Sequence, residues 1–508
     1  MILATVLLSA LISYILFRIT KLIIWVRRAA KLTANIPGPK PLPIIGNALS
    51  FTKVKNPEDA LKVSRVVPPA NSDKPWHRIR RIWLGPKLII HLGDPKHIDE
   101  VLASKDTVNK DPLYGYVKLV LDGMIIKNGK DWHDLRKPLN KILTKQMIES
   151  CITSMHQKAL KLCKRWESVA DSGKLINVRP ELGSYTADNV CLNVCGYDLN
   201  ELENDKFHLS ETLERAVMIF QKLIYRLPTN LSITYSRYSQ TGRELTNKTR
   251  VFTETCIQML RDNMKRKETL KDNNEEHSRN FIDVLVDLKA RDNLSEEEAA
   301  KLATDVLIAG FDTTSVTTAS ILVMLAMFPE HQEAVYQEQL KVVGDDPNII
   351  PTWDQLSNME YLGRVIKEAL RLYCPLAVFR TPTKDIDLGE YTLPAGCTLY
   401  IKLHCLHKDP RFWSHPNEFY PDHFLSEAIA NRPKGCYFPF SAGPRGCPGK
   451  LYGTIVMKML LSTLLRKYKF ETDLKYNELK YKYSIQLEIS GGYLCRIKHR
   501  NKESENVS

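Results

Sequence analysis

The first apolar pattern along the chain is a continuous run rather than a periodic one. Residues 2–17 are apolar apart from three hydroxyl side chains, and residues 22–26 resume the run after Arg18 and Lys21. Because this run falls short of the roughly 20 residues that span a bilayer, we expect one helix to continue while both basic side chains reach back to the interface. The pattern predicts a retained N-terminal membrane anchor over residues 1–32.

The charges around this run predict its orientation. Basic residues interrupt or follow it, and no acidic residue precedes Glu58. Since flanking Lys and Arg stay on the cytoplasmic side, we expect the bulk of the chain in the cytosol. A cleaved signal peptide would begin with a basic segment, and a mitochondrial transit peptide would be an Arg-rich amphipathic helix without a long apolar run. The retained anchor is preferred to both alternatives.

A proline-rich stretch follows the anchor. Pro37, Pro39, Pro41 and Pro43 each fix φ and lack an amide donor, so residues 33–50 are predicted to be a stiff spacer that ends the helix. Residues 51–508 contain no internal repeat and no low-complexity block. They are predicted to form one large domain.

Beyond the spacer, the apolar positions predict a mainly α domain with minor β sheets. The apolar run 87–92, closed by a Gly-Asp-Pro turn, predicts a strand. Helical periodicity dominates from 97 to 375, and the charged stretch 261–279 is predicted to be a surface loop. Alternating segments predict two β-hairpins, one in residues 385–401 and one in residues 481–496 with a Gly-Gly pair at its centre.

One predicted helix stands out by its length and its apolar character. Ser295 and Glu298 form a capping box, and the helical pattern runs to Phe328 before a proline, which corresponds to roughly 50 Å. After Glu298 its only charged residues are Lys301, Asp305 and Asp312. A helix that is apolar on all sides is buried, so it is expected to cross the whole domain. The burial of an Asp on such a helix needs a reason.

Composition narrows the class of protein without choosing a function. The 508 residues are 44% hydrophobic and 26% charged, which is typical of a globular protein with a large core. The odd number of cysteines, 11, has no regular spacing and does not indicate a disulfide framework. The net charge of +14 fits nucleic acid, an anionic membrane or an acidic protein partner. Because the basic residues are scattered without interleaved aromatics, nucleic acid is the least favoured of these.

The most informative segment is the glycine-rich loop at residues 440–449. Glycines at three positions let the backbone turn tightly, and an amphipathic helix is predicted from Lys450 to Lys467. Cys447 stands at this loop-to-helix junction, where amide N–H groups and the positive end of the helix favour thiolate over thiol. By itself such a cysteine is more often a structural thiol. The spacing fits neither a dinucleotide loop, nor a Walker loop, nor a zinc pair with Cys436.

The spacing Phe-x-x-Gly-x-Arg-x-Cys-x-Gly in this loop resembles the haem-binding loop of the cytochrome P450 superfamily at every fixed position. The resemblance implies the cytochrome P450 fold, with haem b between the long central helix and the cysteine-loop helix. It implies that Cys447 is the axial ligand of the haem iron, that Arg445 pairs with a haem propionate and that Phe440 contacts the cofactor. A thiolate suits this chemistry because it favours O–O cleavage.

A second motif lies on the long helix. The segment from Ala309 through Gly310 to Asp312 and Thr313 resembles the oxygen-activation motif of the same family. The resemblance implies that Thr313 hydrogen-bonds dioxygen and that Asp312 helps to deliver protons. Ala309 and Gly310 would lie beside the cofactor, with Gly310 leaving room for dioxygen. The alternative is a Thr bonded back to its own helix next to an Asp held in a salt bridge.

Two weaker motifs agree with this resemblance. Glu368 and Arg371, one helical turn apart, resemble the structural Glu-x-x-Arg pair that supports the cysteine loop. Trp132 and Arg136 resemble the family's Trp-x-x-x-Arg motif and would contact a propionate, for which Arg380 is a further candidate. Isolated pairs of this kind are common on protein surfaces. These two pairs support the resemblance because they occur in the family's order relative to the cysteine loop.

One position departs from the family's pattern. His423 stands where the family usually carries an Arg that completes the scaffold of Glu368 and Arg371. A His is neutral or only partly charged at neutral pH, and it cannot form the planar fork of a guanidinium. We therefore expect the substitution to affect the stability of the haem-bound protein more than its activity.

The resemblance implies a microsomal monooxygenase, most like the family-four clan of insects and vertebrates. The expected reaction inserts one oxygen atom from O2 into a lipophilic fatty acid, hormone, pheromone or xenobiotic. Several members of that clan esterify haem to a Glu at the place of Ala309, which this chain cannot do. The expected location is the endoplasmic reticulum membrane. The alternatives are a haem-thiolate isomerase or dehydratase acting on peroxides, and a non-catalytic haem sensor.

The expected partners follow from what the chain lacks. Only about 40 residues follow the predicted helix after the cysteine loop, too few for a flavin or nicotinamide domain. Electrons are therefore expected from NADPH through a separate NADPH-cytochrome P450 reductase, with cytochrome b5 as an optional partner. An acidic reductase surface is expected to dock on the basic positions Lys434, Arg445 and Lys450.

The substrate contacts implied by this fold are mostly apolar and so predict a lipophilic substrate. They are expected from residues 114–124, from the helix face near Leu307 and Phe311, from the segment after Pro375, and from residues 489–492.

Overall fold

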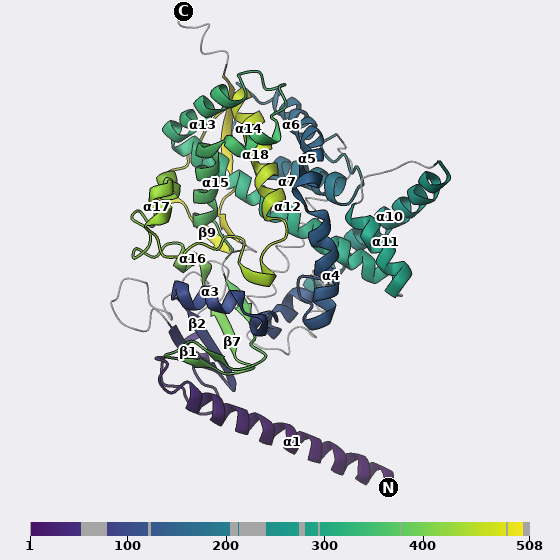
Figure 1. The fold of residues 1–508 in the computed structure, drawn as a ribbon, viewed down its shortest axis with the longest axis vertical. Helices are drawn as coiled ribbons and strands as arrows, with labels where there is room; N and C mark the ends of the chain where they lie inside the picture. The colour runs from purple at the N-terminus through teal and green to yellow at the C-terminus, as the bar shows by residue number, and fades with distance from the viewer. Residues whose placement is uncertain are drawn as a thin grey trace, which may run out of the picture.

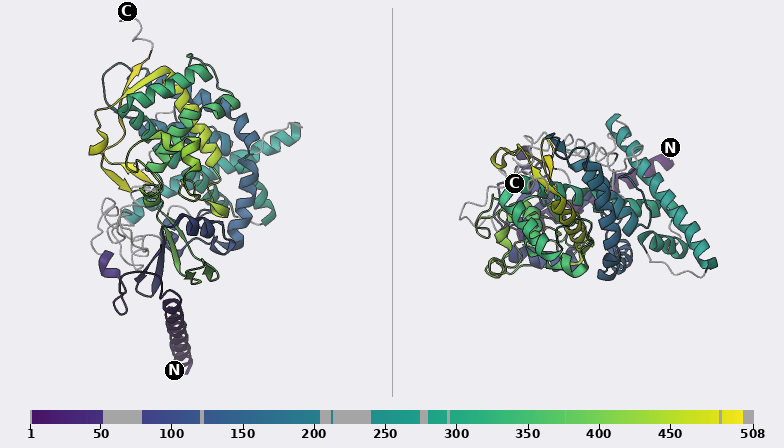
Figure 2. Two further views of the ribbon diagram at one scale, coloured as in Figure 1. Left: turned by 60° about the vertical axis from the view of Figure 1, so that its left-hand side comes forward. Right: turned by 90° about the horizontal axis from the view of Figure 1, so that it is seen from above.

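The protein is a mainly helical body from which one long N-terminal helix extends (Figure 1). The computed structural model describes residues 2–51, 79–119, 123–203, 212, 240–273, 280–292, 295–375, 377–483 and 486–500. The small sheets lie at the end of the body from which that helix extends and along one side (Figures 1 and 2). The prediction of a mainly α fold with minor sheets is therefore confirmed.

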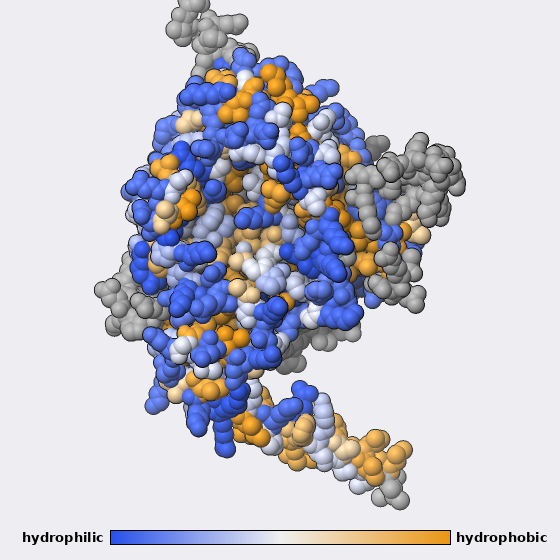
Figure 3. Space-filling view, viewed as in Figure 1, coloured by the Kyte–Doolittle hydropathy of each residue, from blue (hydrophilic) through white to orange (hydrophobic). Residues whose placement is uncertain are grey.

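Helix α1, Ile2–Leu32, continues without a break through Arg18 and Lys21, as the sequence predicted. Most of its apolar side chains are exposed, and they form the orange rod at the lower edge of the space-filling view (Figure 3). Its last turns contact the domain: Trp25 Nε1 donates to Ala395 O at 2.9 Å, and Ala29 is buried. The helix is thus anchored on the domain before the chain reaches the prolines.

The proline-rich residues lie along the first strand of the domain. The amide of Arg81 donates to Pro37 O at 2.9 Å, and the amide of Asn47 donates to Trp83 O at 2.6 Å. Ile36 is 1% exposed. This stretch ends α1 and then packs against the sheet, rather than holding the helix away from it.

Four strands form the main sheet beside α1. The order is β1-β2-β7-β4, with β1 Ile79–Leu84, β2 Lys87–Leu92, β7 Thr398–Ile401 and β4 Val378–Arg380. β1 and β2 form an antiparallel hairpin, whereas β2 and β7 pair in parallel. The strand predicted at residues 87–92 is confirmed with the same bounds.

The centre of the body is α12, Glu296–Met327, whose capping box is present as predicted. Both α1 and α12 are long and apolar enough to cross a membrane, but the apolar window of α12 is 72% buried within the domain. It is a core helix, with α7 Arg179–Asn189, α10 Gln240–Asn273 and α15 Glu360–Leu372 against it and α18 Lys450–Lys467 following the cysteine loop. The other helices are α3 Pro95–Ala103, α4 Gly129–Ile142, α5 Lys145–Ser150, α6 Ile152–Trp166, α11 Phe281–Asp292, α13 Pro329–Val342, α14 Trp353–Asn358, α16 Leu403–Leu406 and α17 Ser426–Ala430.

Two local predictions were wrong. The charged stretch predicted as a loop over 261–279 is helical as far as Asn273, because its Lys, Arg and Glu residues are good helix formers; residues 274–279 lie outside the described residues. The second predicted hairpin is not centred on the Gly-Gly pair. Instead β9 Tyr481–Tyr483 pairs with β10 Leu487–Ile489, before the glycines.

The glycines at 491 and 492 form the turn that leads into a different sheet. Their φ angles of +93° and +98° are left-handed, and after them β11 Leu494–His499 pairs with β8 Tyr468–Glu471 and β3 Ile176–Asn177. The first predicted hairpin, over residues 385–401, is confirmed in its first part by the antiparallel pair β5 Ile386–Asp387 and β6 Thr392–Leu393, whereas its last part is strand β7 of the main sheet.

Candidate active site

A cavity of about 320 Å³ brings together most of the residues that the sequence singled out. It lies between α4, α12, the start of α18 and the cysteine loop, and its lining is mainly apolar. Eight of the predicted residues line it: Trp132, Arg136, Ala309, Gly310, Thr313, Phe440, Arg445 and Cys447. Asp312 and Arg380 lie outside the lining.

The cysteine loop is held by its own backbone. The amide of Cys447 donates to Phe440 O at 2.9 Å, and the short 3-10 turn η8, Gly443–Arg445, packs against α3. Gly443 has a φ of +65°, and a Cβ there would overlap the carbonyl oxygen of Leu102. Only glycine fits at this position, which explains why the loop can bring its cysteine to the cavity.

Cys447 is an exposed residue that lines the cavity, so its thiol opens onto that space. Burial raises its pKa, while the amide of Gly449 and the charges of Arg136 and Lys450 oppose that rise without cancelling it. The backbone amide at this junction favours thiolate, as expected, but burial outweighs it in the chain without a bound cation. A positive ligand on the sulfur would reverse the direction.

Three cationic side chains, Lys110, Arg136 and Arg445, line the cavity, and Arg380 lies outside the lining but close enough to act on Lys110 and Arg445. Burial first, and then the charges of Arg380 and Arg136, lower the pKa of Arg445 to about 9. The pKa of Lys110 is also well below its usual value because of burial and the charges of Arg380 and Arg445. Like charges held this close in a buried place favour an anionic occupant.

Neutral acceptors hold these arginines in place. Arg445 Nε donates to Val108 O at 2.9 Å, and its guanidinium lies over the ring of Trp132. Arg136 donates to Gly446 O at 2.6 Å, so it ties α4 to the cysteine loop. Lys110 was missed by the sequence argument because an isolated Lys in a loop carries no motif.

On α12, the residues four apart face the cavity. Ala309 and Thr313 line it, and Thr313 Oγ1 donates to Ala309 O at 2.8 Å. The carbonyl of Thr313 accepts from Gln486 Nε2 at 3.2 Å, and Gln486 also lines the cavity. Asp312, one residue earlier, points away, is 0% exposed and contacts Arg179 at 3.0 Å.

This arrangement contains both features of the alternative described for the motif, the back-bonded Thr and the ion-paired Asp. Arg179 also contacts Glu488 at 3.3 Å, and Glu488 contacts Lys482 at 3.4 Å. A row of charges therefore leads from the buried Asp312 to the partly exposed Lys482. Neither feature separates Thr313 from the cavity.

Gly310 has a packing role that the sequence did not predict. It lines the cavity, yet a Cβ built on it would come within 2.7 Å of Val190 Cγ2. Val190 begins a π-helical turn, η6 Val190–Val194, that continues α7. The glycine is therefore needed for the close approach of this turn to α12, whatever room it leaves for a ligand.

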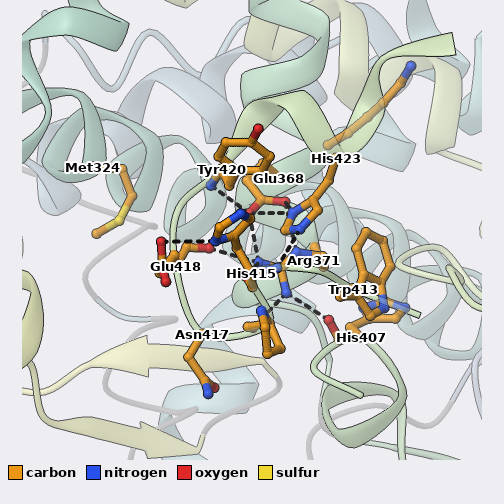
Figure 4. Close-up of polar contacts among 12 residues, drawn as sticks. Met324, Glu368, Arg371, His407, Trp413, His415, Asn417, Glu418, Tyr420 and His423 are labelled. Carbon is orange, nitrogen blue, oxygen red and sulfur yellow. Dashed lines mark hydrogen bonds and ion pairs between the residues drawn. The ribbon is translucent and has the colours of Figure 1, made fainter. Parts of the chain in front are cut away.

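The predicted scaffold pair is fully buried, and Figure 4 shows its polar contacts. Arg371 Nε and Nη2 donate to the two oxygens of Glu368 at 2.8 and 2.7 Å, and both side chains are 0% exposed. The remaining Arg371 protons go to backbone carbonyls, including His407 O and Glu418 O at 2.8 Å. Burial raises the pKa of Glu368, but the bonds from Arg371 and His423 outweigh it and lower the pKa overall.

His423 completes the scaffold as a neutral ring. The amide of His415 donates to its Nε2 at 3.2 Å, so Nδ1 carries the proton. Nδ1 then donates to Glu368, 3.3 Å from each carboxylate oxygen (Figure 4). An Arg at this position could not accept the His415 amide. His423 therefore replaces the family's cation with a ring that accepts a hydrogen bond from the His415 amide and donates one to Glu368.

A family model described as cytochrome P450 matches residues 36–496. The chain belongs to the cytochrome P450 family.

Its curated relatives include several insect proteins named in family four. The chain is 27% identical to cytochrome P450 4g1 of Drosophila melanogaster, over 93% of this chain and 90% of that protein. It is 27% identical to cytochrome P450 4c3 of the same organism, over 93% and 91% of the two lengths. Cytochrome P450 3A17 of Cavia porcellus is 28% identical over 86% of each. This cytochrome P450 is thus a haem-thiolate monooxygenase, an oxidoreductase.

The cavity of this cytochrome P450 fits a haem. A thiol opens onto it, apolar side chains from α12 and α18 line it, and the three cations of the lining, with Arg380 nearby, could pair with two propionates. The burial of these cations is difficult to explain without an anionic group.

The expected substrate contacts were partly misplaced. Leu307 and Phe311 are buried in the core, and Val306 and Thr317 line the cavity instead, because the exposed face of α12 is turned by one residue. Gln486 lines the cavity in place of residues 489–492. From the segment 114–124, Met124 lines it, and the side chains of residues 116–122 lie outside the described residues.

Proposed function

We propose that Cys447 is the axial ligand of the haem iron and that this cytochrome P450 inserts one oxygen atom of O2 into a lipophilic substrate. The observation that supports this most is the single cavity that Cys447, Thr313 and the cationic side chains share. Bound haem supplies the site of dioxygen activation, and its thiolate ligand favours O–O cleavage.

The residues around the cavity are proposed to have three roles: cofactor binding, support of the cysteine loop and substrate binding. Arg136, Arg380, Arg445 and Lys110 bind the propionates, and Trp132 and Phe440 contact the cofactor. Glu368, Arg371 and His423 hold the segment from 407 to 423 that supports the cysteine loop. Apolar lining residues receive the substrate and exclude water from the reaction.

Proton delivery is assigned to Thr313 and Asp312. Thr313 lines the cavity, and its Oγ1, which donates to Ala309 O at 2.8 Å, would be free to turn and donate a hydrogen bond to dioxygen bound there. Asp312 would help to deliver protons toward Thr313, and Arg179, which pairs with both Asp312 and Glu488, would hold the Asp312 carboxylate in place.

Replacement of the cysteine tests the proposal directly. Cys447→Ser should abolish the red-shifted carbon-monoxide spectrum of a thiolate haem and should abolish product formation. Cys405→Ser, which removes a partly exposed thiol outside the cavity lining, should change neither. A Cys447→Ser protein that kept the thiolate spectrum would contradict the assignment of Cys447 as the iron ligand.

Electrons are proposed to come from NADPH through NADPH-cytochrome P450 reductase, with cytochrome b5 as an optional second donor. Lys434 and Lys450 are exposed near the cysteine loop and suit an acidic surface. Arg445 does not belong to this surface, because it is turned inward to Val108 O and Asn128 Oδ1. Reductase-supported turnover should therefore fall as salt rises, and turnover unchanged by salt or independent of NADPH would contradict the partner.

The proposed location is the endoplasmic reticulum membrane, with the domain in the cytosol. Support comes from the exposed apolar surface of α1 and from four exposed aliphatic residues after it, Leu42, Ile44, Ile45 and Leu49. In intact microsomes, protease added outside should digest the domain. Protection of the domain without detergent would reverse the orientation.

A further inference from the structure

The C-terminal part of the chain contributes Gln486 to the cavity. Gln486 precedes β10, is 2% exposed and, among the described residues that line the cavity, is the only one that follows α18. Its Nε2 donates to Thr313 O at 3.2 Å. An amide buried among mainly apolar side chains is costly unless it is paired, so this bond to α12 accounts for a polar residue at this place.

The backbone at Gln486 is held at the end of α15. Gln486 forms an isolated β-bridge with Pro375, and the amide of Leu487 donates to Cys374 O at 3.3 Å. Both partners follow α15, the helix that carries the buried scaffold pair. Because the backbone is held there while the side chain reaches α12, Gln486 links the scaffold helix to Thr313.

The same segment also reaches Asp312. Residues two apart on an extended chain point to the same side, so Gln486 and Glu488 share one side of this segment. Glu488 pairs with Arg179 at 3.3 Å, and Arg179 pairs with Asp312 at 3.0 Å. Both residues to which proton delivery is assigned are thus held from this segment, Thr313 directly and Asp312 through Arg179.

The turn of α12 at Thr313 needs such support because hydroxyl groups bond back onto its carbonyls. Thr313 Oγ1 donates to Ala309 O at 2.8 Å, and Thr317 Oγ1 donates to Thr313 O at 2.7 Å. Back-bonding of this kind competes with the amide donors of a helix and bends it slightly. A side chain that inserts into the helical hydrogen-bond ladder acts in the same way, and Gln486 does so at Thr313 O. The direction of the Thr313 side chain therefore depends on a donor from outside the helix.

We propose that Gln486 is a positioning residue for oxygen activation: by holding the Thr313 carbonyl, it keeps the Thr313 hydroxyl directed to the cavity. The inference rests on the proposed function, since it takes Thr313 to be the hydrogen-bond donor to dioxygen. Gln486 acts through Thr313 and needs no contact of its own with dioxygen. Without this bond the turn relaxes, and the hydroxyl no longer keeps one direction.

Carbon monoxide bound to the dithionite-reduced haem tests this arrangement without a substrate or an electron-transfer partner. It takes the place of dioxygen, and a hydrogen bond donated to it lowers its stretching frequency in the infrared. The full-length, haem-loaded wild type should show one narrow band. Thr313→Val, which removes the hydroxyl, should move that band to higher frequency. Gln486→Met, which keeps the length of the side chain but removes the donor, should move part or all of the band in the same direction.

A double variant separates an indirect role of Gln486 from a direct one. Because Gln486 acts through Thr313, Gln486→Met should add no shift in the Thr313→Val background. Gln486→Asn keeps the amide but is one methylene too short to reach Thr313 O, so it should reproduce the shift even if Gln486→Met binds no haem.

Gln332→Met is the matched control. Gln332 is also 2% exposed and also donates to a carbonyl of α12, Leu325 O at 3.0 Å, but it lies outside the cavity lining. Its replacement should therefore leave the carbon-monoxide band in place.

An unshifted band in both Gln486 variants would overturn the inference alone. So would a Gln486→Met shift that persists without the Thr313 hydroxyl, or an equal shift in Gln332→Met. Two other results would overturn the proposed function and the inference with it. An unshifted band in Thr313→Val counts against the role of Thr313, and a carbon-monoxide complex without the thiolate absorbance counts against Cys447.

Discussion

At the scale of single residues, the buried charges of this cytochrome P450 form two kinds of site. Glu368 and Arg371 neutralise each other, and backbone groups and His423 satisfy what remains. By contrast, burial and the charges of Arg380 and Arg445 lower the pKa of Lys110, and burial and the charges of Arg380 and Arg136 lower that of Arg445. The first is a finished structural pair, whereas the second is arranged for a negatively charged ligand.

Lys110 tests whether that ligand carries carboxylates. Lys110→Met should weaken haem binding about tenfold, because one charge-assisted contact is lost. With haem dimethyl ester, whose propionates are uncharged, wild type and variant should bind alike. Haem transfer to apomyoglobin measures the retention of each form. Lys141→Met removes an exposed Lys of α4 as the control, and a Lys110 effect that persisted with the ester would count against the contact.

The pH dependence of stability tests the scaffold. The pKa of Glu368 is lower in the folded chain than its ordinary 4.5, so the folded state binds fewer protons than the unfolded state. The stabilisation is complete above that ordinary value and is lost as pH falls through the folded pKa. The urea midpoint should drop more steeply below pH 5 in the wild type than in Glu368→Gln. If the urea midpoints of the two proteins fell in parallel with pH, the pKa of Glu368 would not be lowered by folding.

At the scale of elements, α7 and its π-helical turn hold the central motif of α12 at three successive residues. Val190 fills the space that Gly310 leaves, Thr186 Oγ1 donates to Phe311 O at 3.2 Å, and Arg179 pairs with Asp312. The segment that the sequence predicts to activate oxygen is thus also a surface on which α7 packs. This partner could not be predicted, because α7 carries no motif and lies over a hundred residues earlier.

The packing of Gly310 predicts a rescue experiment. Gly310→Ala should destabilise the protein by about 1–3 kcal/mol, since its Cβ would press on Val190 Cγ2. Val190→Ala creates space at the same contact, so the double variant should recover most of the loss. Thermal unfolding and the haem content of the four proteins measure this cycle. Strictly additive effects would mean that the two residues do not press on each other.

What the sequence predicted and missed follows from the range of each interaction. The capping box of α12 and the strand β2 are local, and both were predicted correctly. The face of α12 turned toward the cavity was misjudged by one residue, because a helix that is apolar all round shows no preferred side. The sheet partners of β11 and the position of Lys110 depend on distant segments, which spacing along the chain does not encode.

At the scale of the whole molecule, α1, the proposed membrane anchor, runs into the domain without a break in the helix. The N-terminal end of α1 is exposed and apolar (Figures 1 and 3). In its last turns, Trp25, Val26 and Ala29 pack against apolar residues of the main sheet. An ion pair between Arg28 and Asp385 adds to this contact. With α1 in a bilayer, as proposed, this contact would fix the tilt of the domain relative to that bilayer.

Two truncations separate the two roles of α1. Removal of residues 2–24 should release the protein from liposomes in flotation assays and leave the unfolding temperature unchanged, because the buried last turns remain. Removal of residues 2–32 should also lower the free energy of unfolding by about 2–4 kcal/mol, the order expected when two or more packed apolar side chains leave the sheet. Trp25→Ala in the shorter truncation should reproduce part of that loss, since it removes the bond to Ala395 O. Equal stability of both truncations would mean that α1 is a tether and that the domain is free to tilt.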